Sequence, residues 1–246
     1  MFMMIDAHIH INQYSDKDIQ DIMSQNIQCV AVATDLKSCY RLLALKNENI
    51  HIALGYHPEQ RIDKNEVEEI LRLIDTHHHE IVAIGEVGLP QYLMRQDQSI
   101  KLQPYIDILK AFMNKARAHQ LPVILHAVYD DARIVMELLR EYQIQKAHFH
   151  WFKADKDVLE EVLNSDYMVS VTPDILWNVK TRRVAQALPL HRLTIETDGP
   201  WPHEGFEAKE IKSQLSAIIK ELELFYPRAE NIESIMTYNT KAFYRI

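Results

Sequence analysis

Short apolar or β-branched runs recur along the chain, and stretches with the hydrophobic spacing of helices separate most of them. In residues 64–77, for example, Val67, Ile70 and Ile74 recur three or four positions apart, which places them on one face of an amphipathic helix. The apolar runs predict eight strands, at residues 3–9, 28–34, 51–55, 81–85, 122–126, 146–150, 168–171 and 193–196.

This alternation of strands and helices predicts an α/β fold. Parallel strands need crossover helices, and eight strand–helix units favour a single TIM-like (β/α)8 barrel. An open, doubly wound sheet has the same local pattern, so periodicity alone leaves both architectures open. Residues 207–246 predict one or two closing helices. Because 246 residues with 47% hydrophobic content can bury one large core and no linker interrupts them, we expect a single domain spanning residues 1–246.

The composition narrows the range of functions. The chain has 5 glycines, and no glycine-rich turn follows the first predicted strand. A dinucleotide-binding fingerprint or a P-loop needs such a turn, so nucleotide-cofactor chemistry is not expected. The formal net charge of -8 argues against a general electrostatic grip on nucleic acid, and any polyanion would need a local basic patch.

Cysteine usage and the first residues bear on the compartment. Cys29 and Cys39 form neither a CxxC pair nor a zinc-ribbon pattern, which fits a reducing cytoplasm. Residues 1–11 are apolar but are interrupted by ionisable residues and lack a basic region, so they predict neither a signal peptide nor a membrane span. We expect a cytoplasmic protein without membrane association, and nothing implies an obligate protein partner.

Asp6, His8 and His10 stand two residues apart, so in a strand all three side chains point to the same face. Polar groups that face a barrel interior must pair with one another or bind something. Two imidazoles at this spacing can converge on one ion, although the spacing by itself is more often structural. The positions of the other polar residues therefore decide between a metal site and a structural pair.

Ligand-type side chains recur at the C-terminal ends of the predicted strands, and these ends form the active face of such barrels. Four imidazoles and two carboxylates suit Mg, Mn, Zn, Fe or Ni, and six ligands exceed what one tetrahedral zinc ion requires. We therefore expect two divalent metal ions per chain, with Glu86 as the best candidate to bridge them. The expected ligands are His8, His10, Glu86, His126, His150 and Asp198.

Six short blocks follow one another in a recognisable order: residues 6–10 (DAHIH), 55–58 (GYHP), 85–89 (GEVGL), 121–126 (LPVILH), 150–152 (HWF) and 196–200 (ETDGP). In order and spacing they resemble the TatD family of metal-dependent deoxyribonucleases, within the amidohydrolase superfamily. Residues 239–243 (NTKAF) are similar to the closing helix of that family, so the resemblance spans nearly the whole chain. It implies a TIM-like barrel that hydrolyses phosphodiester bonds, with DNA or another phosphodiester as substrate.

The resemblance also implies a role for each site residue. A water bound to the metals would be the nucleophile, because coordination lowers its pKa towards about 7. The catalytic residues would be Asp198, which orients or deprotonates this water, Glu86 and His57, which approaches the substrate or supports the ligands. In the implied metal centre His8, His10 and Asp198 hold one ion, His126 and His150 hold the other, and Glu86 bridges them.

The chain departs from the family pattern at positions expected to face the substrate. Val128 stands where an arginine usually follows the histidine of the fifth strand, Pro90 replaces an aspartate, and Lys153-Ala154 replaces a small Ser/Thr-Gly pair. Because arginine binds phosphate through a bidentate fork, its absence weakens the case for a phosphodiester more than the case for hydrolysis. Two alternatives therefore stay open: an amide, ester or lactone hydrolase of the same superfamily, and a non-catalytic metal-binding scaffold.

Other conspicuous side chains have a structural interpretation as well as a functional one. The tryptophans Trp151, Trp177 and Trp201 follow the last three predicted strands, where they would either stack on bases or pack a lid. His148 shares a face with His150 and would either support the metal ligands or form a hydrogen bond in the interior. The candidate phosphate contacts, each of which could equally be a solvated charge, are Arg61, Arg95, Lys153, Lys180, Arg182 and Arg183.

Overall fold

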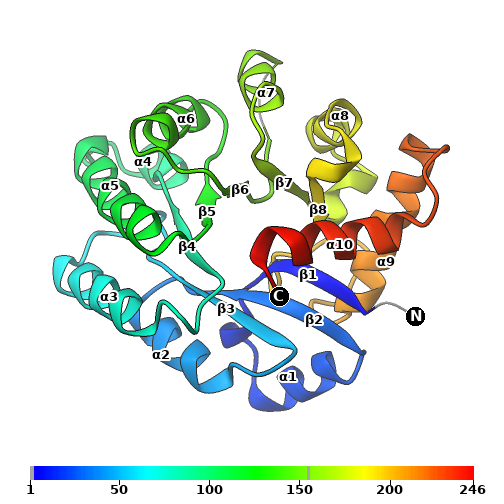
Figure 1. Ribbon diagram of the computed structural model, residues 1–246, viewed down its shortest axis with the longest axis horizontal. Coiled ribbons are helices and arrows are strands. Elements are labelled where there is room, and N and C mark those ends of the chain that lie inside the picture. Colours follow the sequence, from blue (N-terminus) through cyan, green and yellow to red (C-terminus); the bar gives the residue numbers. More distant parts are fainter. Residues whose placement is uncertain (1–2, 154–155) are drawn as a thin grey trace.

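The computed structural model describes residues 3–153 and 156–246, and Ala154, one of the departures noted above, lies outside this range. The described residues form eight parallel strands in the order β1 to β8, with helices around them, so the predicted TIM-like (β/α)8 barrel is confirmed over the open sheet (Figure 1). The strands are β1 (Met4–Ile9), β2 (Ile27–Val32), β3 (Ile50–Leu54), β4 (Ala83–Gly88), β5 (Val123–His126), β6 (Ala147–Phe149), β7 (Met168–Val171) and β8 (Leu193–Ile195).

The helices follow the amphipathic pattern of the sequence. In α3, Val67, Ile70 and Ile74 are buried as predicted, and the Asp63 carboxylate caps the helix by accepting the backbone N–H groups of Asn65 and Glu66. The α-helices are α1 (Asp16–Met23), α2 (Leu36–Leu45), α3 (Lys64–His77), α4 (Gln91–Gln96), α5 (Leu102–His119), α6 (Asp131–Glu141), α7 (Lys156–Leu163), α8 (Val179–Ala187), α9 (Ile211–Phe225) and α10 (Ile232–Tyr244). Short 3-10 helices are η1 (Ile11–Gln13), η2 (Pro173–Leu176) and η3 (Leu190–Arg192).

The predicted fourth strand ended too early. The prediction stopped at residue 85, but β4 runs on to Gly88, which pairs with His126 of β5, so Glu86 lies within the strand. The glycines near Glu86 allow close packing, and Gly85 does not end the strand. A Cβ at Gly55 would lie 2.5 Å from the carbonyl carbon of Gly85, and one at Gly88 would lie 2.0 Å from the carbonyl oxygen of His126. Glycine therefore lets the backbones meet beside Glu86.

Backbone hydrogen bonds join the end of β8 to β1 at the carboxyl ends of the strands. The N–H of Asp198 donates to the His8 carbonyl at 3.0 Å, and the N–H of His10 donates to the Gly199 carbonyl at 2.8 Å. The buried Asp6 carboxylate strengthens this junction by accepting the backbone N–H of Thr197 at 3.0 Å. The contacts that bring the last strand against the first therefore also bring Asp198 to the two histidines.

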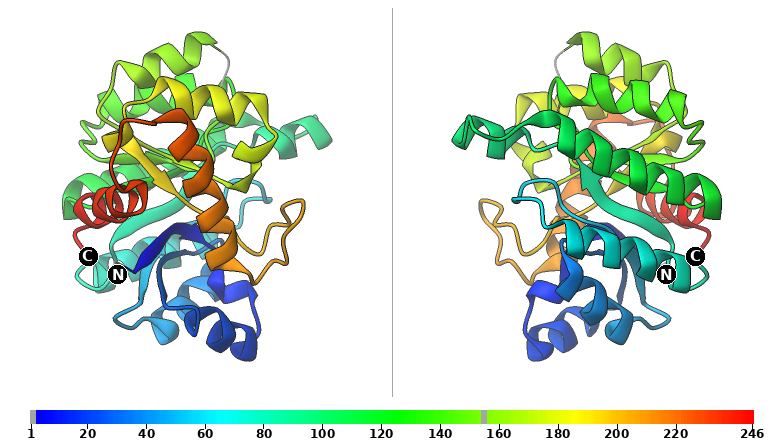
Figure 2. Two further views of the ribbon diagram at one scale, coloured as in Figure 1. Left: turned by 90° about the vertical axis from the view of Figure 1, so that its right-hand side faces the viewer. Right: turned by 90° about the vertical axis from the view of Figure 1, so that its left-hand side faces the viewer.

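One end of the barrel is closed and the other carries the loops. Phe243 and Tyr244 of α10 share one buried apolar cluster with barrel residues such as Val32 and Ile124. In Figure 2 the start of β1 and the end of α10 lie at this end, whereas α4 and the orange segment after β8 project from the opposite end. The described residues include no helix long and apolar enough to cross a membrane. The loop-bearing end is therefore where a ligand can reach the strand ends.

Candidate metal centre

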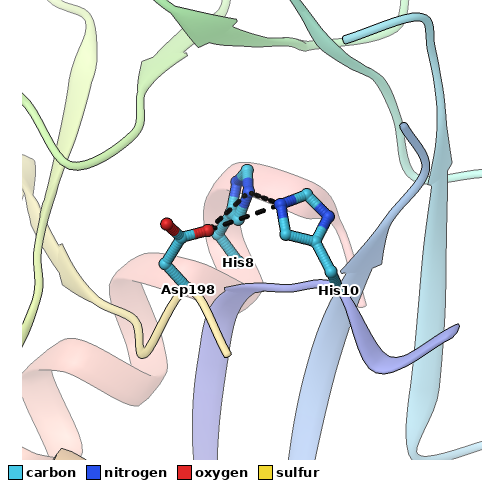
Figure 3. Close-up of side chains that lie close together, drawn as sticks. All are labelled: His8, His10 and Asp198. Atoms are coloured by element: carbon cyan, nitrogen blue, oxygen red, sulfur yellow. Dashed lines mark hydrogen bonds and ion pairs between the residues drawn. The ribbon is translucent and has the colours of Figure 1, made fainter. Parts of the chain in front are cut away.

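His8 and His10 of the first strand and its following turn meet Asp198 from the turn after β8. Figure 3 shows the two imidazoles and the carboxylate facing one another. The Nε2 atoms of His8 and His10 lie 3.4 Å apart, and Asp198 Oδ1 lies 3.5 Å from the first and 3.4 Å from the second. The Oε2 atom of Glu86 lies 3.3 Å from His8 Nε2 and 3.5 Å from His10 Nε2. Four ligand-type atoms thus surround one point.

The spacing of these four atoms fits a metal ion. The five separations above are nearly equal, as the edges of a tetrahedron are, with values from 3.3 to 3.5 Å. An ion at the centre of a tetrahedron with such edges would lie about 2.1 Å from each corner, which matches the bond lengths of zinc to nitrogen and oxygen. Neither Glu86 Oε2 nor Asp198 Oδ1, both buried, receives a hydrogen bond of normal geometry from the described residues. The residues therefore fit a divalent cation.

The other oxygen of Glu86 faces a second set of imidazoles. Glu86 Oε1 lies 2.8 Å from His126 Nδ1, 2.9 Å from His150 Nε2 and 3.4 Å from His57 Nε2. His126 is the last residue of β5, and His150 directly follows β6. The fully buried Glu86 carboxylate therefore stands between two groups of nitrogen atoms, with one oxygen towards each.

Three of the ring nitrogens that point away from the centre have acceptors of their own. Metal-binding histidines usually donate their second N–H to a carboxylate or carbonyl, which fixes the ring and its tautomer. His10 Nδ1 lies 2.9 Å from the carbonyl oxygen of Val32, and His150 Nδ1 lies 3.2 Å from Glu196 Oε1. His126 Nε2 lies 3.2 Å from Glu59 Oε1. Three of the four expected histidine ligands are thus oriented in the manner of metal ligands.

Glu59 and Glu196 were not predicted from the sequence. Glu196 stands two residues before Asp198 near the end of β8, so the same period-two argument that selected His8 and His10 could have found it. Glu59 lies in the loop after β3, where no periodicity reports side-chain direction. It also accepts the backbone N–H groups of Tyr92 at 2.9 Å and Leu93 at 2.6 Å. This carboxylate therefore ties the start of α4 to His126.

Protonated histidines balance the negative charge of the carboxylates in the candidate metal centre. Burial would raise the pKa of Glu86, but the charges of His150, His57 and His8 hold that pKa well below its ordinary value. Burial would lower the pKa of His10 and of His126, yet close contacts with the neighbouring ionised carboxylates raise the two values to about 10 and about 9. The ionised carboxylates therefore attract positive charge, and a divalent ion can supply it in place of the protons.

The other residues singled out from the sequence have contacts of their own. His148 lies in the barrel interior, where its Nδ1 bonds the Tyr244 hydroxyl at 2.6 Å and its Nε2 lies 3.7 Å from Glu196 Oε2. Val128 is 8% exposed, and Pro90 precedes α4.

Among the cationic candidates, Arg61 pairs with Asp97 and Arg182 pairs with Glu221. Arg95 and Lys180 both lie over the Tyr129 ring, at 5.3 Å and 4.7 Å from its centroid.

This arrangement, at the carboxyl ends of the strands of a TIM-like barrel, places the chain among the metal-dependent hydrolases. Comparisons with known proteins agree. The family model described as TatD related DNase matches residues 5–245, so the chain belongs to the TatD family. An uncharacterised metal-dependent hydrolase of Haemophilus influenzae is 43% identical over 251 residues, which cover 99% of this chain and 100% of the relative.

Two further proteins are similar to this chain, one in structure and one in sequence. The crystal structure of YjjV, a TatD homologue from Escherichia coli K12, superposes with a TM-score of 0.82 at 23% identity, covering 99% of this chain and 98% of that one. A human protein named deoxyribonuclease TATDN3 is 25% identical over 217 residues, which cover 80% of this chain and 78% of the relative. The likeness to YjjV supports the fold, and the sequence relatives support metal-dependent hydrolysis.

Proposed function

We propose that the chain is a phosphodiesterase that hydrolyses DNA with two divalent metal ions bound at the loop-bearing end of the barrel. The observation that carries the proposal is that the two oxygens of the Glu86 carboxylate face different pairs of histidines. Its Oε2 atom faces His8 and His10, and its Oε1 atom faces His126 and His150. A carboxylate in this position can bridge two cations and partly offset their mutual repulsion.

Each site residue has a role in this proposal. His8, His10 and Asp198 would hold one ion, His126 and His150 would hold the other, and Glu86 would contact both. Bound divalent ions would lower the pKa of a coordinated water towards about 7 and polarise the phosphoryl group. The Asp198 carboxylate, whose side chain is 11% exposed, would orient the attacking water and accept its proton. His57, at 22% exposure, is the more accessible imidazole beside Glu86 and would contact the substrate.

DNA is the proposed substrate because of the family and because of one relative. The matching family model is described as a TatD related DNase, and the human relative is named a deoxyribonuclease. The acidic chain has no general attraction for a polyanion, since its formal net charge is -8. Recognition would therefore rely on the metal ions and on specific contacts around them.

A second candidate is an amide, ester or lactone hydrolase, and Val128 is the observation that favours it. This buried apolar side chain occupies the position where the resemblance places a phosphate-binding arginine. A neutral substrate would not need that positive charge. A metal-binding scaffold without activity is a third outcome.

The deciding experiment is a parallel assay of metal-loaded protein on labelled single-stranded DNA, a generic phosphodiester and a panel of esters, lactones and amides. The proposal predicts turnover of DNA and of the generic phosphodiester, with loss of both after chelation. Turnover of amides, esters or lactones without any phosphodiester would establish the second candidate. Metal-loaded protein that turns over none of them would be a scaffold.

A further inference from the structure

Three indole rings and one imidazole gather on the segments that follow β6, η2 and β8. The ring centroids of Trp151 and Trp201 lie 5.8 Å apart with the planes at 69°. The His203 ring lies 5.5 Å from Trp151 and 6.4 Å from Trp177. Trp177 and Trp201 remain 44% and 57% exposed, whereas His203 is 6% exposed. Two indoles therefore stay accessible around a buried imidazole.

This aromatic cluster of Trp151, Trp177, Trp201 and His203 is continuous with the candidate metal centre. Trp151 directly follows His150, and its backbone N–H donates to Glu196 Oε1 at 2.7 Å, the same oxygen that lies beside His150 Nδ1. The backbone N–H of Trp201 donates to the carbonyl of Asp198 at 3.0 Å. Since three residues span at most about 11 Å, Trp201 lies within reach of any substrate held beside Asp198.

A buried carboxylate holds the cluster in place. Asp174, 3% exposed, accepts the indole N–H of Trp151 at 3.0 Å and pairs with the Lys153 ammonium at 2.9 Å. The same Lys153 nitrogen lies 3.9 Å from the centroid of the Trp151 ring, so a cation covers one face of that indole. The His203 imidazole is anchored separately, with its Nε2 at 2.7 Å from the Thr197 carbonyl oxygen. The supporting rings are thus fixed, and Trp177 and Trp201 offer the exposed faces.

We propose that Trp177 and Trp201 form a stacking subsite for the unpaired nucleobases of single-stranded DNA next to the metal centre, an inference that rests on the proposed function. Aromatic side chains bind single strands by stacking on successive bases, and the contact tolerates any sequence because every base has a π face. Bases of a duplex cover one another, so the subsite selects an unpaired strand. An acidic chain with Val128 in place of the arginine also needs affinity that does not come from charge.

Lid packing, the alternative for large aromatics in loops, would bury the rings against the protein. Trp151 and His203 follow that pattern because they are held by Asp174 and by the Thr197 carbonyl. Trp177 and Trp201 do not follow it, since about half of each residue faces solvent. Exposed apolar surface beside a candidate metal centre can mark a ligand-binding site, which is the role assigned here to these two rings.

The test uses metal-loaded protein and two hydrolysis-resistant strands of ten phosphorothioate linkages, one carrying thymine at each position and one fully abasic. Both strands carry the same charge, so fluorescence anisotropy reports the contribution of the bases. The variants are Trp201→Leu and Trp177→Leu, which keep an apolar side chain without a ring, and Trp201→Phe, which keeps a ring. Tyr238→Leu, a change at an exposed aromatic residue of α10, is the matched control.

We expect the thymine strand to bind roughly tenfold or more tightly than the abasic strand, as base stacking on an aromatic side chain requires. Each leucine variant should remove most of that difference, whereas Trp201→Phe and Tyr238→Leu should keep it. Metal content equal to that of the wild type would show that the centre is intact. Equal affinity for both strands, or leucine variants with unchanged preference for bases, would overturn the subsite.

Failure of the proposed function is visible separately. If metal-loaded protein hydrolyses no phosphodiester, the proposed function is wrong, and the binding assay still decides the subsite. Base-dependent affinity that Trp201→Leu abolishes would then support the subsite in a protein that binds DNA without cleaving it. Hydrolysis of DNA without base-dependent affinity would remove the subsite alone, and absence of both would remove both proposals.

Discussion

At the end of the barrel closed by α10, buried side chains bond neutral partners, whereas at the loop-bearing end buried carboxylate oxygens lack hydrogen-bond donors in the part of the chain that the structure describes. The Tyr244 hydroxyl bonds His148 at 2.6 Å, and the Asn239 amide donates to the carbonyls of Leu190 and Leu193 at 2.9 and 2.8 Å. At the other end, Glu86 Oε2 and Asp198 Oδ1 are buried without a hydrogen bond of normal geometry from the described residues. Both ends contain histidines, and within residues 3–153 and 156–246 His148 Nε2 also lacks a hydrogen bond, but the contrast lies in these two buried carboxylate oxygens without donors at the loop-bearing end.

The difference shows how a buried polar group can be assigned to stability or to function. A polar network with all its bonds made holds the native structure together, and removing one partner exposes the desolvation cost of the other. Buried carboxylates without donors are costly unless a cation compensates them. Mutations at the closed end should therefore change stability, and mutations at the loop-bearing end should change metal binding and turnover.

The largest expected effect follows from Glu86→Gln. The amide keeps the shape of the side chain but cannot bridge two cations, so kcat should fall on the order of a thousandfold or more and about one ion per chain should be lost. Single-turnover rates and elemental analysis of the purified variant measure both quantities. A variant with the metal content and the rate of the wild type would contradict the bridging role.

Asp198→Asn should lower kcat on the order of a hundredfold or more while the fold stays intact. The amide provides neither the negative charge that faces His8 and His10 nor the basicity to accept a proton. If Asp198 merely caps the turn into residues 199–200, asparagine would serve equally well and the rate would stay near normal. Comparison of single-turnover rate, metal content and thermal midpoint separates the two interpretations.

Glu59→Gln should weaken metal binding by roughly tenfold, because partners that orient a ligand histidine typically contribute about 10- to 100-fold in affinity. The change leaves all six predicted ligands in place, so the effect measures the support that Glu59 gives to His126 and to the start of α4 and not the loss of a ligand. Competition of the protein with a chromophoric chelator gives the affinity. Glu137→Gln, an exposed position on α6, is the matched control, and equal affinities in the two variants would remove Glu59 from the centre.

Tyr244→Phe at the closed end should have the smallest effect on turnover and a clear effect on stability. Loss of the hydroxyl deprives the buried His148 of its bond, which should lower the free energy of unfolding by about 1–3 kcal/mol and leave kcat unchanged. Urea unfolding and the rate on a generic phosphodiester measure the two quantities. Tyr238→Phe, an exposed position on the same helix, is the control, and a large loss of kcat in Tyr244→Phe would break the contrast between the ends.

The fold could be predicted from the sequence because hydrophobic periodicity reports burial directly. The spacing in residues 64–77 matched α3 at both ends, and the run at residues 168–171 matched β7. The end of β4 was missed because glycine normally weakens a strand, whereas here Gly88 permits a close approach to the His126 backbone. That approach depends on a neighbour 38 positions away in the sequence, which no local pattern contains.

The convergence of the six predicted ligands could be predicted for a similar reason. Side chains at the carboxyl ends of parallel strands meet at one end of a barrel, so His8, His126 and Asp198 could be grouped without knowing any distance. Glu59 could not, because a loop residue has no period that fixes its direction. Its position beside His126 depends on hydrogen bonds to the backbone at the start of α4. The predicted ligands that lie at strand ends could therefore be grouped from the sequence, and Glu59, which a loop positions, could not.

The pKa values of His10 and His126 indicate how ion binding should depend on pH. With values of about 10 and about 9, His10 and His126 are protonated near neutral pH, but an ion can bind only their neutral forms. Metal binding should therefore release protons. Affinity should rise with pH by about tenfold per unit for each proton released, as long as the pH stays below both pKa values.

Calorimetric titration of a divalent metal into chelator-treated protein tests the central claim most directly, because one measurement gives both the number of ions and, from repeats in buffers of different ionisation heat, the protons released. The account predicts about two ions per chain, proton release between pH 6 and 8, and roughly one ion with Glu86→Gln. Binding of no ion, or of two ions unaffected by Glu86→Gln, would contradict it.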